Sequence, residues 1–164
     1  MVVAQGSRSA GQSAASAKTE KFVHTAAVAN MVEIQSSQVA LQKTTNEQVK
    51  DFADLMIKDH TRIGDELKSI AQKQNLQLPK GLDSESQSLL ERLQSESGSR
   101  FDRTYARMML KAHRQAVKLF QSYAQKGDDR QLRKWAQQTL PTLQEHLRRA
   151  EAMERSLPPR TSAR

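Results

Sequence analysis

One glutamate and three of the four histidines in this sequence stand at the centres of apolar helical faces. When residues are placed at about 100° per step, four stretches of the chain each form one apolar face, and each face has one polar residue near its middle. These residues are Glu33, His60, His113 and His146. Three imidazoles and one carboxylate form a ligand set that suits Zn, Fe, Mn or Cu. The pattern therefore predicts a single transition-metal ion inside a helical core.

The cost of burying polar groups supports this interpretation. A buried polar group without a hydrogen-bond partner costs about 1–3 kcal/mol, and a buried charge costs more. Four such groups are therefore tolerated only where they meet one another or a shared ion. A cluster that binds protons rather than a metal is an alternative. Another is an ordinary core in which Glu33 and Asp102 accept hydrogen bonds from the histidines.

Three further polar residues and three methionines accompany these positions. Asp59, Asp102 and Tyr105 are expected to hydrogen-bond the ligands rather than to bind the ion. Methionine at helical spacing usually fills a core, but thioether ligation of copper is an alternative. The methionines that share the stripes with the histidines are Met56, Met109 and Met153.

Four long helices must position these side chains. Helix-forming residues dominate, and the chain has 4% aromatic residues, 6 glycines and 4 prolines. Asn46, Asp83 and Asp128 are candidate N-caps, and Pro79 with Gly81 interrupts the longest connection. The predicted long helices span residues 19–43, 46–75 and 100–126, and a fourth runs from Asp128 to about residue 157.

We therefore expect an all-α protein. Its domain is an antiparallel four-helix bundle over residues 19–157, with a short extra helix between helices two and three. Residues 1–18 and 158–164 are expected to form disordered tails. Counting from the turns places Glu33 and His60 at nearly the same depth, whereas His113 and His146 differ by about one turn.

Several classes of function have no support in the sequence. The absence of cysteine excludes disulfides, thiolate metal sites and cysteine catalysis. No stretch approaches the roughly 18 consecutive apolar residues of a membrane-spanning helix. Because the chain also lacks a nucleophile with an adjacent base, a phosphate-binding glycine loop and an H-E-x-x-H pattern, we do not expect a hydrolase or a kinase.

The net charge of +8 invites acidic partners such as nucleic acid or an anionic membrane surface. Basic residues recur every three or four positions on the outward face of the helix over 100–126. They are Arg100, Arg103, Arg107, Lys111, Arg114 and Lys118. This basic stripe could bind an anionic surface or polyanion. We favour a solvated helix face, because aromatic platforms and known DNA-binding motifs are missing.

Five segments also carry a family resemblance. They are EKFVHTAAVANMVEIQSSQVAL, VKDFADLMIKDH, LPKGLD, FDRTYARMMLKAH and LPTLQEHLRRAE, within residues 20–153. Together they resemble the bacterial family catalogued as domain of unknown function 4142, whose members are often labelled outer membrane or exported proteins. The resemblance implies a ferritin-like fold and a periplasmic location, but no established reaction. The small-residue segment AQGSRSAGQSAASA is similar to the start of a mature exported protein from which a signal peptide has been trimmed. By this match the family's recurring polar positions are Glu33, Asp59, His60, Asp102, Tyr105, His113 and His146.

The sequence departs from the ferritin-like di-iron proteins in one respect. Those proteins use a Glu-x-x-His pair on each of two helices, whereas Ile57 and Leu143 stand three residues before His60 and His146. We therefore do not expect ferroxidase or iron-storage chemistry. The sequence predicts a periplasmic bundle of unknown physiological role that binds one metal ion. The alternative is a non-catalytic envelope stress or interaction protein.

Overall fold

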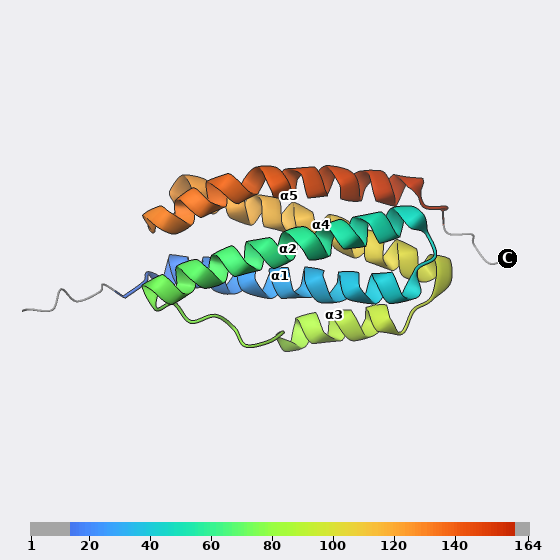
Figure 1. The fold of residues 1–164 in the computed structure, drawn as a ribbon, viewed down its shortest axis with the longest axis horizontal. Coiled ribbons are helices and arrows are strands. Elements are labelled where there is room, and N and C mark those ends of the chain that lie inside the picture. The colour runs from blue at the N-terminus through green and yellow to red at the C-terminus, as the bar shows by residue number, and fades with distance from the viewer. Residues whose placement is uncertain (1–13, 160–164) are drawn as a thin grey trace, which may run out of the picture.

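Five helices make up the part of the protein that the computed structural model describes, residues 14–159, and this part contains no strand. Their bounds are α1 Ala17–Lys43, α2 Glu47–Gln74, α3 Ser84–Gln94, α4 Gly98–Lys126 and α5 Arg130–Ser156. Four helices are long and lie side by side along the longest axis, whereas α3 is short and lies along their flank (Figure 1). The prediction of an all-α protein is confirmed. None of these helices is long and apolar enough to cross a membrane.

Two of the predicted N-caps start their helices. At the start of α2, Asn46 Oδ1 accepts hydrogen bonds from the backbone N–H groups of Gln48 and Val49, at 3.0 and 3.2 Å. At the start of α3, Asp83 Oδ1 accepts from the N–H of Ser86 at 2.7 Å. Short polar side chains satisfy the unpaired N–H groups of a first turn, and this fixes where each helix begins.

The predicted cap of α5 is wrong by one residue. Asp129, rather than Asp128, accepts from the N–H of Leu132 at 2.8 Å, so that α5 begins at Arg130. Asp128 accepts instead from the hydroxyl of Thr19 at 2.7 Å. Two adjacent aspartates are equally good caps by residue type, and the tertiary contact with α1 decides between them.

Two other helices begin earlier than predicted. α1 begins at Ala17, because the side chain of Ser16 caps its first turn. α4 begins at Gly98, whose φ of 57° lies in the left-handed region that glycine adopts without a steric cost. Residues 1–13 and 160–164 of the predicted tails lie outside the described residues.

The helices form two hairpins. The turn at residues 44–46 joins α1 to α2, and the turn at residues 127–129 joins α4 to α5, so each pair is antiparallel (Figure 1). α1 packs on α4 and α2 packs on α5, which encloses a common core. The connection between the hairpins contains α3 and runs back along the molecule, so α2 and α4 point in the same direction (Figure 1). α3 contacts both α1 and α4 and therefore covers the seam between these two helices.

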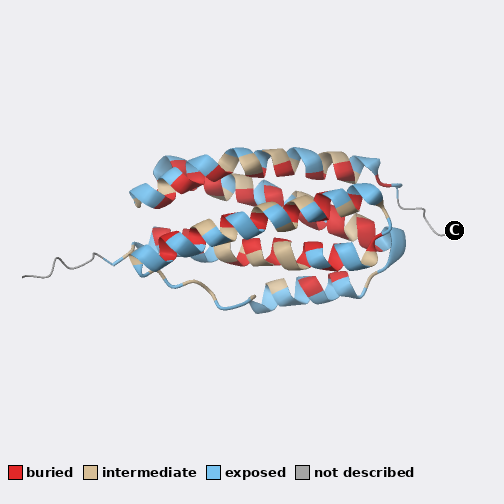
Figure 2. Ribbon diagram, in the orientation of Figure 1, coloured by how far each residue is buried: buried red, intermediate tan, exposed pale blue. Residues whose placement is uncertain are grey.

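The apolar core has two parts. Buried residues follow the inward sides of the long helices (Figure 2). One cluster, which includes Met56, Phe101 and Met153, fills the half of the molecule near the α1–α2 turn. The other cluster, which includes Phe22 and Trp135, fills the half near the α4–α5 turn. The four polar residues singled out in the sequence lie along their helices between these two clusters.

Candidate metal centre

The structure brings together the four residues predicted to be metal ligands, one from each long helix: Glu33 from α1, His60 from α2, His113 from α4 and His146 from α5. Each residue is at most 3% exposed. His60 Nε2 contacts Glu33 Oε2, and His113 Nε2 lies 3.3 Å from the same oxygen. One nitrogen from each of the three histidines lies within 4.8 Å of the others. The four side chains therefore converge on one point in the core.

The rings of His113 and His146 meet, with centroids 5.3 Å apart. α4 ends at Lys126, 13 residues after His113, and α5 begins at Arg130, 16 residues before His146. The count from the turn thus still differs by three residues, close to one helical turn, and the side chains bridge this difference.

An amide from α1 orients the imidazole of His60. His60 Nδ1 lies 2.9 Å from Asn30 Oδ1, and because an amide oxygen only accepts, Nδ1 carries the hydrogen. The lone pair of His60 is then on Nε2, which faces Glu33. Gly64 makes room for this amide, because a Cβ at position 64 would lie 2.7 Å from Asn30 Nδ2.

The other two histidines are oriented in the same way. His113 Nδ1 donates to the backbone oxygen of Met109, at 2.8 Å. His146 Nε2 donates to Asp59 Oδ2, also at 2.8 Å. Metal-binding histidines usually donate their second ring N–H to a carbonyl or carboxylate in this manner, which fixes the tautomer and the direction of the lone pair. When the rings are neutral, these hydrogen bonds leave each of them one nitrogen with a free lone pair that faces the centre of the site.

Four inward atoms of the site lack a hydrogen-bond partner within the described part of the chain. These fully buried atoms are Glu33 Oε2, His60 Nε2, His113 Nε2 and His146 Nδ1. Buried polar atoms are almost always satisfied in folded proteins, so four such atoms at one point form a place that could hold a cation, or a proton shared between Glu33 and His60. Four ligands about 2.0–2.1 Å from a tetrahedral ion lie about 3.3–3.4 Å from one another. The 3.3 Å between His113 Nε2 and Glu33 Oε2 is close to this spacing, whereas His60 Nε2 and Glu33 Oε2 lie closer together than two ligands of one ion would.

The protonation states also suit a cation. Burial on its own would raise the pKa of Glu33, but the nearby imidazoles of His113, His60 and His146 outweigh it and lower the pKa from 4.5 to about 2. Burial lowers the pKa of His146 from 6.5 to about 4, although the hydrogen bond that His146 donates to Asp59 acts in the opposite direction. At neutral pH the site therefore presents an ionised carboxylate and a neutral imidazole, the forms that bind metals.

Of the three residues predicted to support the ligands, the structure brings only Asp59 to a histidine. Asp102 accepts a hydrogen bond from Thr44 Oγ1 at 2.6 Å, next to the α1–α2 turn. It lies 11 residues before His113, about 16 Å further along α4. The hydroxyl of Tyr105 forms a hydrogen bond with Ser37 Oγ at 2.8 Å, and burial raises the pKa of this phenol.

Sequence reasoning missed Asn30 and Gly64. Both carried a signal, because an asparagine beside an apolar face needs a partner, and a glycine inside a helix costs about 1 kcal/mol relative to alanine. The methionines considered as copper ligands, Met56, Met109 and Met153, are buried in the apolar cluster beside the site.

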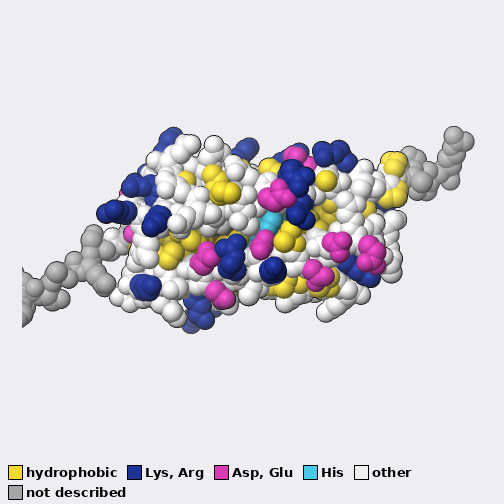
Figure 3. Space-filling view, turned by 45° about the horizontal axis from the view of Figure 1, so that its top comes forward, with side chains coloured by type: hydrophobic (Ala, Val, Ile, Leu, Met, Phe, Trp, Pro, Cys, Tyr) yellow, Lys and Arg dark blue, Asp and Glu magenta, His cyan; other side chains and the backbone are white. Residues whose placement is uncertain are grey.

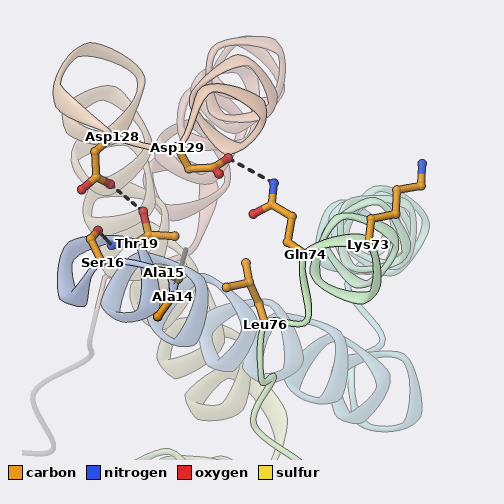
Figure 4. A pocket seen from close by; sticks show the side chains of 9 residues that line it. All are labelled: Ala14, Ala15, Ser16, Thr19, Lys73, Gln74, Leu76, Asp128 and Asp129. Atoms are coloured by element: carbon orange, nitrogen blue, oxygen red, sulfur yellow. Dashed lines mark hydrogen bonds between the residues drawn. The ribbon is translucent and has the colours of Figure 1, made fainter. Parts of the chain in front are cut away.

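A second polar cluster lies at the end of the molecule, where α1 begins, α2 ends and α4 turns into α5 (Figure 4). Here Thr19 Oγ1 donates to Asp128 at 2.7 Å, and Gln74 Nε2 donates to Asp129 at 3.3 Å. The hydroxyl of Tyr123 also forms a hydrogen bond with the hydroxyl of Thr19, at 2.6 Å. These groups satisfy one another, so the cluster connects helix ends and has no unpaired ligand to offer.

Comparison with known proteins gives a family and a fold. A model of the family described as "Domain of unknown function (DUF4142)" matches residues 4–153. The solved structure described as "Crystal structure of DUF305 fragment from Deinococcus radiodurans" is similar with a TM-score of 0.77 and 14% sequence identity. The similarity covers 88% of this chain and 100% of that one, and at this identity it concerns the fold alone. No curated protein matches the chain significantly.

Proposed function

The chain belongs to the family described as a domain of unknown function (DUF4142), a description that assigns no reaction, and we propose that it binds a single transition-metal ion. The ligands are Glu33, His60, His113 and His146. One observation carries the proposal: an oxygen and three nitrogens, all buried and without hydrogen-bond partners, converge from four helices. A cation at their centre satisfies all four at once.

The ligand set narrows the choice of metal. Three neutral imidazoles and one carboxylate suit Zn, Cu or Fe better than Mn, which prefers oxygen ligands. The carboxylate leaves one positive charge on a divalent ion, which the buried site tolerates better than two. Four protein ligands in tetrahedral positions are typical of Zn²⁺ sites that stabilise a fold rather than catalyse a reaction. We therefore rank Zn²⁺ first.

We also propose that the bundle is of the ferritin-like type. A ferritin-like four-helix bundle has one long crossover between two antiparallel hairpins, and the connection through α3 is of this kind. A di-iron centre is not part of the proposal, because it needs several carboxylates. Leu143, which occupies the place of one of them, packs in the apolar cluster near the α4–α5 turn.

Elemental analysis tests the metal site. The protein is purified without chelators, analysed for bound metals, then stripped and titrated with Zn²⁺, Cu²⁺, Fe²⁺ and Mn²⁺. We expect one ion per chain, and none in a variant with His60→Ala, His113→Ala and His146→Ala. Because three cavities can unfold the protein, Glu33→Gln serves as a milder variant, with its helix content checked by circular dichroism. A wild-type protein that neither contains nor takes up metal contradicts the proposal.

A second candidate function is binding of the basic stripe to an anionic surface or polyanion. Arg107, Lys111 and Lys118 are exposed on α4, whereas the ion pairs Arg100–Glu96 and Arg114–Glu151 are long, at 3.8 Å. Phosphate contacts release counterions, so binding to anionic vesicles should weaken steeply between low and high salt. Reversal of the three exposed charges should abolish it. An affinity for anionic vesicles that does not change with salt concentration contradicts this second function.

A periplasmic location is also part of the proposal. It rests on the resemblance of the segments quoted above to exported proteins. Fractionation of cells that express the full natural gene product tests it, and recovery of the protein with cytoplasmic markers contradicts it.

A further inference from the structure

We propose that the metal ion enters and leaves between α2 and α5, and that Asp59 is the carboxylate that binds the ion first at this seam. This inference rests on the proposed metal site. It concerns the route to that site and adds a residue with a role in loading.

A route is needed because the four ligands are enclosed. None of them is more than 3% exposed, so an ion in solution cannot reach a donor atom without a local opening of the bundle. Tight turns join α1 to α2 and α4 to α5, which restrains the two hairpins internally. Openings are therefore expected at the two seams where one hairpin meets the other, α1 with α4 and α2 with α5.

The two seams differ. α3 contacts both α1 and α4 and covers their seam on the outside. Among the described elements, none is recorded in contact with both α2 and α5 in the same way. On the face of the molecule shown in Figure 3, acidic and basic side chains gather near the middle. Of the two seams, the α2/α5 seam is therefore the one that no described helix lies across.

The hydrogen bonds that orient the histidines identify the residue at this seam. His60 is held by the buried Asn30, and His113 by a backbone oxygen of the fully buried Met109. Only His146 is held by a group that reaches solvent, since the side chain of Asp59 is 19% exposed. Asp59 Oδ2 accepts from His146 Nε2, while the other ring nitrogen of His146 faces the centre. The pair thus connects the surface to the ligands.

The charge of Asp59 is available to an incoming cation. Two carboxylates of α2 and α5 are paired with arginines: Glu66 with Arg62 at 2.9 Å, and Glu145 with Arg148 and Arg149 at 2.7 and 2.8 Å. Within residues 14–159, the recorded ion-pair partner of Asp59 is His146 alone. A carboxylate without an arginine beside it attracts cations and raises their local concentration.

The rate of Co²⁺ loading tests the inference, because tetrahedral Co²⁺ absorbs visible light and its uptake can be followed in a stopped-flow instrument. Asp59→Asn keeps an oxygen that accepts from His146 but removes the charge. We expect it to slow loading by about fivefold or more at low salt, with a smaller effect at high salt. Asp59→Glu should restore most of the rate. Asp54→Asn, which removes an exposed carboxylate of the same helix, should load like the wild type.

The outcomes separate this inference from the proposed function. If Asp59→Asn loads Co²⁺ at the wild-type rate, or if Asp54→Asn slows it equally, the route is wrong although the site stands. If the wild-type protein takes up no Co²⁺ or Zn²⁺ at all, the site itself is wrong. A slower Asp59→Asn variant that still reaches one ion per chain supports both.

Discussion

Gly64 and Asn30 both help to position His60. The amide of Asn30 fixes the tautomer of His60, and the missing side chain at position 64 leaves space for that amide. Groups that hydrogen-bond a metal ligand typically contribute 10–100-fold to affinity. The position of one buried amide is therefore expected to matter for an ion that it does not touch.

Gly64→Ala tests this relation. The new Cβ would lie 2.7 Å from Asn30 Nδ2 and would push the amide away from His60. We expect Zn²⁺ affinity, measured by competition with a chelating dye, to fall by about tenfold. Asn30→Ala should cause a similar loss, and the double variant should be little worse than either single one, because both act on His60. Additive losses would show that the two residues act independently.

The depressed pKa of His146 makes the stability of the metal-free protein depend on pH. Between pH 6.5 and about 4 the unfolded chain binds a proton on His146 that the folded chain does not. The free energy of unfolding should therefore decrease as the pH falls through this window. Glu33, whose pKa is lowered from 4.5 to about 2, should decrease the free energy of unfolding further as the pH falls below 4.5.

Urea denaturation of chelator-treated protein at several pH values measures this effect. In the His146→Gln variant, the free energy of unfolding should depend less on pH between 6.5 and 4. Its further decrease below pH 4.5, which Glu33 causes, should be unchanged. A free energy of unfolding that is constant or rises as the pH falls from 6.5 to 4 would mean that His146 is not buried in its neutral form.

The convergence of the four central residues could be predicted from the sequence because helical periodicity alone places them at the middle of apolar faces. Their partners could not. Asp102 lies on the same face of α4 as His113, but its distance along the helix puts it with Thr44 instead. The hydrogen bond between Asn30 and His60 depends on how α1 and α2 are aligned, which the sequence does not give. The partner of His113 is the backbone oxygen of Met109, and every residue type has such an oxygen.

At the scale of the helices, α3 is expected to stabilise the seam that it covers. Leu93 is fully buried against the cluster near the α1–α2 turn, whereas Leu89 on the same helix is 40% exposed. Leu93→Ala should lower the free energy of unfolding by about 2–5 kcal/mol. Leu89→Ala should change it by no more than about 0.5 kcal/mol. Chemical denaturation measures both, and equal effects would mean that α3 does not pack as described.

Two of the three predicted caps are confirmed. Asn46 caps α2, where its neighbour Thr45 is a weaker cap by residue type, and Asp83 caps α3 although Ser84 follows it. Asp128 and Asp129 are adjacent, and the choice between them depends on a contact with Thr19 from a distant part of the chain. The direction of α4 depends in the same way on tertiary structure, because a long connection can return along the bundle or stay at one end.

At the scale of the molecule, an ion bound at the proposed site is expected to stabilise the whole fold, because the site lies between the two halves of the core. A ligand whose free concentration is about 100 times its dissociation constant stabilises the native state by about 2.7 kcal/mol. For a chain of this size, this shift corresponds to a rise in melting temperature of about 5–10 °C. Calorimetry with Zn²⁺ and with chelator measures it. Glu33→Gln should have a smaller rise, and identical melting with and without metal would mean that no buried site is filled.

The hairpin topology also has a consequence for the order of events during folding. Each hairpin carries two of the four ligands, Glu33 with His60 and His113 with His146. Contacts within a hairpin are local in sequence and form early, whereas docking of the hairpins requires closure of a long loop. Neither hairpin alone has enough donors to enclose an ion, so tight metal uptake can only follow docking. In a refolding experiment the Co²⁺ absorption band would therefore report the moment at which the two halves of the chain meet.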